Sequence, residues 1–224
     1  MGGVERLMHA WRIEDREYRR QETLRGRRHA FTRLDPARTA LIVVDMVGFF
    51  AEESGYVRGI VPNIARLADA TRDAGGTVVW VLPAVSPPDA VATEFFGAAQ
   101  AEVFRLSGGA GAPRDRLWHE FTVDDADLIV EKTATSAFFP GRSPLPELLP
   151  ARGIDNVIIT GTVTNVCCEA SARDASTLGY RVVMVADANA ARRDEDHNNT
   201  LYTIYRTYGD VRTTDDVIGL LADA

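Results

Sequence analysis

Short runs of apolar, largely β-branched residues alternate with helix-length amphipathic segments from Thr39 onward. This alternation is typical of an α/β domain, in which crossover helices join parallel strands and cover both faces of the sheet. A further short strand is predicted near Val211. The five main predicted strands span residues 40–45, 77–82, 127–131, 156–160 and 181–186.

The segments between these strands predict amphipathic helices. Pro62 is placed to begin the first of them and Gly75-Gly76 to end it. Further helices are predicted near residues 91–105, from Asp194 to Tyr208 and from Thr214 onward. The inward stripe of the first helix is formed by Ile64, Leu67, Ala68 and Thr71.

Two segments depart from this regular pattern. Residues 1–38 predict a helical arm on the main body or on a neighbouring subunit, because residues 5–30 mix apolar side chains with charges of both signs. Residues 39–224 are then a single domain. The irregular stretch 83–120 is of the kind that often covers a site, and its glycine-rich part at 107–113 is read as a flexible loop, since it does not directly join a strand to a helix.

The composition excludes several classes of protein. The 224 residues are 46% hydrophobic and 25% charged, which is ordinary for a globular chain that buries its own core. A net charge of −7 and a pI of about 5.2 give no positive field that would attract nucleic acid or an anionic membrane. We find no apolar run of about 18 residues and no signal-peptide pattern, so we expect a cytoplasmic protein.

Asp45 and Lys132 stand where predicted strands end. The carboxyl ends of parallel strands form the crevice in which open α/β sheets bind ligands. Taken alone, Asp45 fits a residue that caps the following loop as well as it fits a catalytic one. Lys132 is the one lysine in a chain with 24 arginines. This contrast indicates a tight site that accepts a compact ammonium group and excludes a guanidinium. The alternative is a surface lysine that is present by chance.

Cys167 and Cys168 are the two cysteines of the chain. We expect both to be free thiols, because a disulfide between adjacent residues is strained and would not link separate parts of the chain. Cys167 follows the fourth strand through a sharp turn and begins a helix. A helix N-terminus lowers a thiol pKa and offers free N–H groups to an oxyanion. Cys167 is therefore the predicted nucleophile, and Cys168, a quarter turn away, is predicted to pack between helix and sheet.

These residues resemble the isochorismatase-like cysteine hydrolases, which include nicotinamidases, N-carbamoylsarcosine amidases, ureidoacrylate amidases and biuret hydrolases. The resemblance covers roughly residues 39–222. Three segments look most like the streptothricin-hydrolase branch: the N-terminal His9-Ala10-Trp11, Asn165-Val-Cys-Cys168 and Asp187-Ala-Asn-Ala190. The motifs that carry the resemblance are Ala40-Leu-Ile-Val-Val-Asp45-Met, Glu131-Lys132-Thr133 with Ser136-Ala-Phe-Phe139, and Thr160-Gly-Thr-Val-Thr-Asn-Val-Cys-Cys-Glu169 with Ala172-Arg-Asp-Ala175.

The resemblance implies a three-layer α/β/α, Rossmann-like fold with a six-stranded parallel sheet. It also implies a triad in which Cys167 attacks, Asp45 carries protons and Lys132 lies between them. It further implies a cis peptide bond between Thr162 and Val163. We expect the amides of Val163 and Cys167 to form an oxyanion hole, and a small amide substrate to be cleaved through a thioester.

One departure from the nicotinamidase pattern concerns metal binding. That group looks to carry an Asp and several His after the first strand, whereas residues 46–84 contain no histidine. The four histidines are scattered in the sequence and show no ligand spacing, so neither a metal nor a cofactor is predicted. The cysteine argues for C–N bond cleavage, since family members that act as isochorismatases lack it.

The substrate pocket is predicted from side chains near these motifs, with core packing as the alternative for each aromatic. A redox-sensing or small-molecule-binding domain would use the paired thiols but would leave Asp45 and Lys132 without a role. A nucleotide-binding module lacks its glycine motifs. We expect a homodimer or homotetramer that binds no nucleic acid and no membrane. The predicted pocket walls are Phe50, Trp118, Phe138, Phe139 and Asn165.

Overall fold

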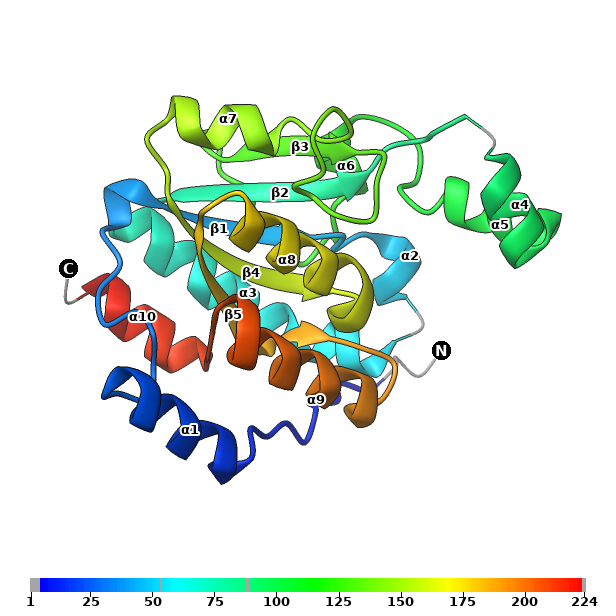
Figure 1. Ribbon diagram of the computed structural model, residues 1–224. Coiled ribbons are helices and arrows are strands. Elements are labelled where there is room, and N and C mark those ends of the chain that lie inside the picture. The colour runs from blue at the N-terminus through cyan, green and yellow to red at the C-terminus, as the bar shows by residue number, and fades with distance from the viewer. Residues whose placement is uncertain (1–4, 53, 88, 223–224) are drawn as a thin grey trace.

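A computed structural model describes residues 5–52, 54–87 and 89–222. Six strands form one sheet, all neighbours parallel, in the order β3-β2-β1-β4-β5-β6 (Figure 1). Every predicted strand is present, with ends close to those expected except that the fifth continues to Ala190. The strands are β1 (Thr39–Val44), β2 (Thr77–Pro83), β3 (Leu128–Lys132), β4 (Asn156–Thr162), β5 (Arg181–Ala190) and β6 (Asp210–Arg212).

Helices cover both faces of the sheet, which confirms the predicted three-layer α/β/α fold (Figure 1). All six residues of β1 are buried, and successive side chains face opposite layers. Ile42 and its alternate neighbours pack with α7 (Leu145–Ala151), α8 (Glu169–Thr177) and α9 (Asp194–Thr203). Leu41 and Val43 pack with α3 (Gly55–Asp73) and α10 (Thr214–Ala222). No helix of the described residues is long and apolar enough to cross a membrane.

Helix α3 begins earlier than the sequence predicted. It begins at Gly55, where the Ser54 hydroxyl accepts a hydrogen bond from the Val57 amide, and Pro62 lies inside it. The prediction that Pro62 opens the helix is therefore wrong. The cap at Ser54 and the burial of Val57, Ile60 and Val61 favour the longer helix despite the backbone donor that proline lacks. The predicted inward stripe of this helix is buried as expected.

The helix predicted over residues 91–105 is divided in two. Gly97, with φ of 82°, separates α4 (Ala90–Phe96) from α5 (Ala98–Arg105). A positive φ costs glycine little and would strain other residues, so the chain can turn here. The two helices extend away from the sheet at the right of Figure 1. Their large apolar side chains are exposed at Val91, Phe95, Phe96, Val103 and Phe104.

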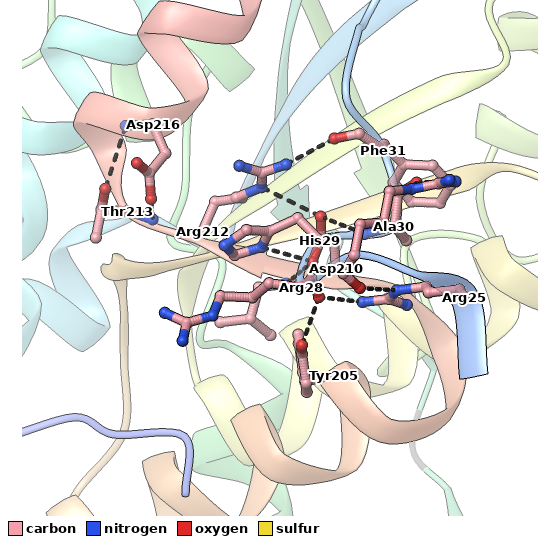
Figure 2. Close-up of polar contacts among 12 residues, drawn as sticks. Arg25, Arg28, His29, Ala30, Phe31, Tyr205, Asp210, Arg212, Thr213 and Asp216 are labelled. Atoms are coloured by element: carbon pink, nitrogen blue, oxygen red, sulfur yellow. Dashed lines mark hydrogen bonds and ion pairs between the residues drawn. The ribbon is translucent and has the colours of Figure 1, made fainter. Parts of the chain in front are cut away.

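Over residues 5–38, the structure has one α-helix, α1 (Asp15–Arg25), and a short 3-10 helix (Pro36–Arg38), while residues 5–14 have no regular secondary structure. After α1, the chain is attached to the edge strand β6 through the fully buried carboxylate of Asp210 (Figure 2). That carboxylate pairs with His29 Nδ1 at 3.0 Å, with the Ala30 amide at 3.0 Å and with Arg212 at 3.1 Å. These contacts hold residues 29–30 against the edge of the sheet and satisfy a charge that would be costly if it were buried alone.

Candidate active site

Asp45, Lys132 and Cys167 meet near the point where the strand order reverses, between β1 and β4. Open α/β sheets bind their ligands at this point. Asp45 directly follows β1, and Lys132 is the last residue of β3. Cys167 lies in a π-helical turn, Thr164–Cys168, that joins β4 to α8. All three therefore come from the carboxyl edge of the sheet, although 35 residues separate even the nearer pair, Lys132 and Cys167.

The Lys132 ammonium contacts both of the other groups. Its Nζ lies 2.9 Å from Asp45 Oδ2 in an ion pair, and it donates hydrogen bonds to Cys167 Sγ at 3.7 Å and to the Ala134 carbonyl at 3.2 Å. The ammonium therefore contacts a carboxylate, a sulfur and a carbonyl oxygen at once. Lys132 is 4% exposed and Asp45 is fully buried, while Cys167 is partly exposed. The arrangement leaves the sulfur as the group open to a small molecule.

The backbone around these side chains is unusual in three places. Asp45 has a positive φ of 54°, a conformation that Asp tolerates better than most residues. At Gly161, a Cβ would lie 2.1 Å from the Val44 carbonyl oxygen, so only glycine lets β4 pass this close to the end of β1. The Thr162–Val163 peptide bond that follows is cis. The backbone of Val163 makes a hydrogen bond with the Cys167 side chain.

Burial and mutual charge control the ionisation of the site. Burial raises the pKa of Asp45, and the nearby Lys132 charge opposes this effect. Burial alone would lower the pKa of Lys132, but the charges of Asp45 and Cys167 and its hydrogen bonds to them raise it above its ordinary value. Lys132 is therefore a cation held against a carboxylate, an ion pair whose partners would each be costly to bury alone.

The pKa of the Cys167 thiol differs from the prediction. The sequence suggested a pKa lowered by the helix N-terminus, whereas burial and the charge of Asp45 raise it to about 12. That expectation is wrong for this environment, because a carboxylate beside the sulfur disfavours a second negative charge. Cys167 therefore rests as a thiol, with Asp45 close enough to accept its proton.

The raised pKa predicts how the alkylation of Cys167 by iodoacetamide depends on pH. The rate should rise roughly tenfold per pH unit from about pH 7 to pH 10, since only the thiolate reacts and a pKa of about 12 lies above this range. Peptide mass spectrometry separates Cys167 from Cys168. The urea-unfolded chain is the control, because an ordinary cysteine with a pKa of about 8.5 levels off above about pH 9. A plateau below pH 9 in the folded protein would contradict the raised pKa.

The predicted pocket residues fall into two groups. Trp118 is 8% exposed and lies beside the residues that follow Asp45, because its amide donates to the Met46 carbonyl at 2.8 Å. Phe50 is partly buried in the short helix α2 (Gly48–Ala51). Phe139 is 52% exposed and Asn165 is exposed in the Cys167 turn. Phe138 is instead fully buried in the core, where it packs edge-on against Tyr180, so its assignment to the pocket wall is wrong.

Sequence reasoning missed three polar supports of the site. The Ala134 carbonyl binds Lys132, as described above. The Ser171 hydroxyl donates to the Cys167 carbonyl at 2.6 Å and accepts from the Ala137 amide at 2.9 Å, joining α8 to the loop after β3. His197 on α9 shares a 2.9 Å hydrogen bond with Thr164 in the Cys167 turn. A lone backbone carbonyl, serine or histidine carries no spacing pattern from which such a contact could be predicted.

Cys168 packs between helix and sheet, as predicted. It is fully buried, and its Sγ lies 4.0 Å from the Thr160 carbonyl of β4. Its pKa is raised well above the ordinary value because burial disfavours the thiolate. Within the described residues, no group of three or more His, Cys, Asp or Glu side chains could hold a metal ion.

Comparisons with known proteins agree with this fold. A family model described as an isochorismatase domain matches residues 39–216. A ureidoacrylate amidohydrolase of Agrobacterium fabrum is 30% identical, with 85% of this chain and 93% of the relative covered. A cysteine hydrolase structure from Pseudomonas syringae pv. phaseolicola superposes with a TM-score of 0.75 at 31% identity, covering 87% of this chain and 97% of that one. An N-carbamoylsarcosine amidase structure from Thermoplasma acidophilum superposes with a TM-score of 0.65 at 27% identity, covering 80% of this chain and 97% of that one.

Proposed function

This chain belongs to the isochorismatase family, and we propose that it is a cysteine hydrolase that cleaves a carbon–nitrogen bond, other than a peptide bond, in a small amide, lactam or ureide. The observation that carries the proposal is the contact of one ammonium, Lys132, with both a carboxylate and a thiol at the carboxyl edge of the sheet. A nucleophile and its base within reach of one orienting group are what acyl transfer requires.

In the first half-reaction, Cys167 Sγ attacks the substrate carbonyl carbon as its proton passes to Asp45. The amides of Val163 and Cys167 stabilise the negative charge that develops on the carbonyl oxygen. Asp45 then gives the proton to the leaving nitrogen, the C–N bond breaks and the amine departs. The acyl group remains on Cys167 as a thioester, and Asp45 is again a carboxylate.

In the second half-reaction, Asp45 takes a proton from a water molecule whose oxygen attacks the thioester carbon. The C–S bond then breaks, and the sulfur recovers a proton from Asp45 as the acid leaves. Lys132 stays protonated throughout, holds the Asp45 carboxylate in place and stabilises the sulfur while it carries negative charge. The raised thiol pKa supports this sequence, because it keeps the proton on Cys167 until a substrate is present.

The class of substrate is supported by the relatives. Two of them are named as a ureidoacrylate amidohydrolase and an N-carbamoylsarcosine amidase, which favours a ureide or a related amide. The resemblance of the N-terminal arm, of residues 165–168 and of residues 187–190 to streptothricin hydrolases adds a streptothricin lactam as the most specific candidate.

A panel of small amides, ureides and a streptothricin lactam tests the proposal through release of ammonia or amine. We expect turnover of at least one compound, inhibited in proportion to alkylation of Cys167. Full alkylation of Cys167 that leaves turnover unchanged, or no turnover of any compound by a folded preparation, would refute it. The latter result would favour a binding or redox-sensing role, although the complete burial of Cys168 leaves the paired thiols poorly placed for redox sensing.

A further inference from the structure

We propose that the N-terminal segment 5–13 and His197 are positioning elements of the active site, acting through α9 on the turn that carries Cys167. The inference rests on the proposed role of Cys167 as nucleophile. It assigns a function to a segment that lies outside the matched family domain, which begins at residue 39.

The first link joins α9 to the Cys167 turn. Thr164 is fully buried, and its hydroxyl shares a 2.9 Å hydrogen bond with Nδ1 of His197, which is also fully buried. Thr164 lies in the same π-helical turn as Cys167. One turn further along α9, the Thr200 hydroxyl donates to Glu169, the residue with which α8 begins. Helix α9 therefore holds the turn on both sides of Cys167.

The second link joins the N-terminal segment to His197. The His9 ring is stacked between Tyr56, at 3.9 Å between centroids, and His197, at 4.3 Å. His9 Nδ1 pairs with Asp194, the first residue of α9, at 2.7 Å, and its Nε2 accepts the Ala191 amide at 3.0 Å. Because Nε2 accepts from the Ala191 amide, Nδ1 is the ring nitrogen that donates to Asp194.

The N-terminal segment is held from both sides. On α3, the Gly55 carbonyl accepts the Leu7 amide at 3.0 Å, and a Cβ at Gly59 would lie 1.8 Å from the Leu7 carbonyl oxygen, so the segment approaches the helix at a position that only glycine allows. On α9, the side chain of Asn198 accepts from the Arg12 amide at 2.7 Å and donates to the Ala10 carbonyl at 3.1 Å.

These contacts form one continuous chain from α3 through His9 and His197 to the Cys167 turn. Burial, and the nearby His9, lower the pKa of His197 to about 3, so its ring is neutral at ordinary pH and the hydrogen bond to Thr164 is not lost on titration. Buried polar groups in such a network are stable only while each keeps its partner. Loss of His9 would therefore loosen α9 and allow the Cys167 turn to shift, and a shift of about 1 Å in a reacting group can cost up to 10²-fold in rate.

Iodoacetamide alkylation of Cys167 at a fixed pH tests the inference without any substrate. We expect alkylation about tenfold faster in Thr164→Val, which keeps the shape but loses the hydroxyl, and in His9→Ala, because a loosened turn moves the sulfur away from the burial and the Asp45 charge that raise its pKa. Thr164→Ser, which keeps the hydroxyl, should react like the parent protein. Arg12→Ala is the matched control in the segment, because its exposed side chain is removed while its backbone hydrogen bond is kept.

With any amide from the panel, kcat should fall about tenfold in the same two variants with KM within about twofold. The double variant should be no slower than the worse single variant, because both changes break the same chain of contacts. Circular dichroism confirms that each variant is folded. Alkylation and kcat within twofold of the parent in folded Thr164→Val and His9→Ala would overturn the inference. Absence of turnover on the whole panel would instead refute the proposed function, since the alkylation result does not depend on it.

Discussion

Replacing Cys167 by serine is expected to lower the turnover of an accepted amide by on the order of 10⁴-fold or more. A serine hydroxyl is far less acidic than a thiol, and the base available to it is Asp45, a buried carboxylate already paired with Lys132. A carboxylate in that position can take a proton from sulfur as it attacks but is too weak a base to activate an alcohol. The measurement is the steady-state rate of amine release, compared with the parent protein.

Cys168→Ala is the matched control for this substitution. The neighbouring thiol is fully buried against β4, so its removal leaves a small cavity in the core and no change at the sulfur that faces the substrate. We expect turnover within a few-fold of the parent protein and a modest loss of stability. Equal loss of turnover in the two variants would assign the effect to packing and would contradict the role of Cys167.

Lys132→Arg is expected to lower turnover by about 10²- to 10³-fold although the positive charge is kept. The ammonium is paired with Asp45 and donates to Ala134 and Cys167, in a site where the residue is 4% exposed. A planar guanidinium is larger and directs its donors differently, so it would displace either the carboxylate or the sulfur. Lys132→Met should lose at least as much turnover and should also lower the free energy of unfolding by about 3–5 kcal/mol, because Asp45 is left as an unpaired buried charge.

Turnover and urea unfolding separate the two effects. Arg193→Lys is the surface control, since its ion pair with Asp196 is exposed and a change there should alter neither quantity. Turnover of Lys132→Arg close to that of the parent protein would show that only a positive charge is needed and would remove the geometric argument for lysine.

Much of the fold was predictable because a buried parallel strand needs a continuous apolar run. The β1 run is buried along its whole length and was located almost to the residue. The predictions failed where tertiary packing overrides a local preference. Pro62 is usually found at a helix start, but the apolar residues before it are buried more favourably in a longer helix. Gly97 lies in a segment whose composition favours one continuous helix, and it nevertheless separates α4 from α5.

The positions of Asp45, Lys132 and Cys167 were also predictable, since parallel strands bring their carboxyl ends to one edge. The electrostatics of the site were not, because the pKa of Cys167 depends on the depth of burial and on the distance to a carboxylate, neither of which appears in the sequence. The network from His9 to Thr164 was missed for a similar reason. Its histidines are far apart in the chain and were interpreted as scattered, whereas the fold stacks their rings at 4.3 Å.

Trapping of the acyl-enzyme tests the central claim most directly. An accepted amide is mixed with the enzyme and quenched in acid within the first turnovers, and the peptide that contains both cysteines is sequenced by mass spectrometry, while a parallel reaction contains hydroxylamine to intercept a short-lived thioester. The account predicts the acyl mass on Cys167 and formation of the hydroxamate at the expense of the acid. Rapid hydrolysis with neither product, or an acyl mass on Cys168, would contradict it.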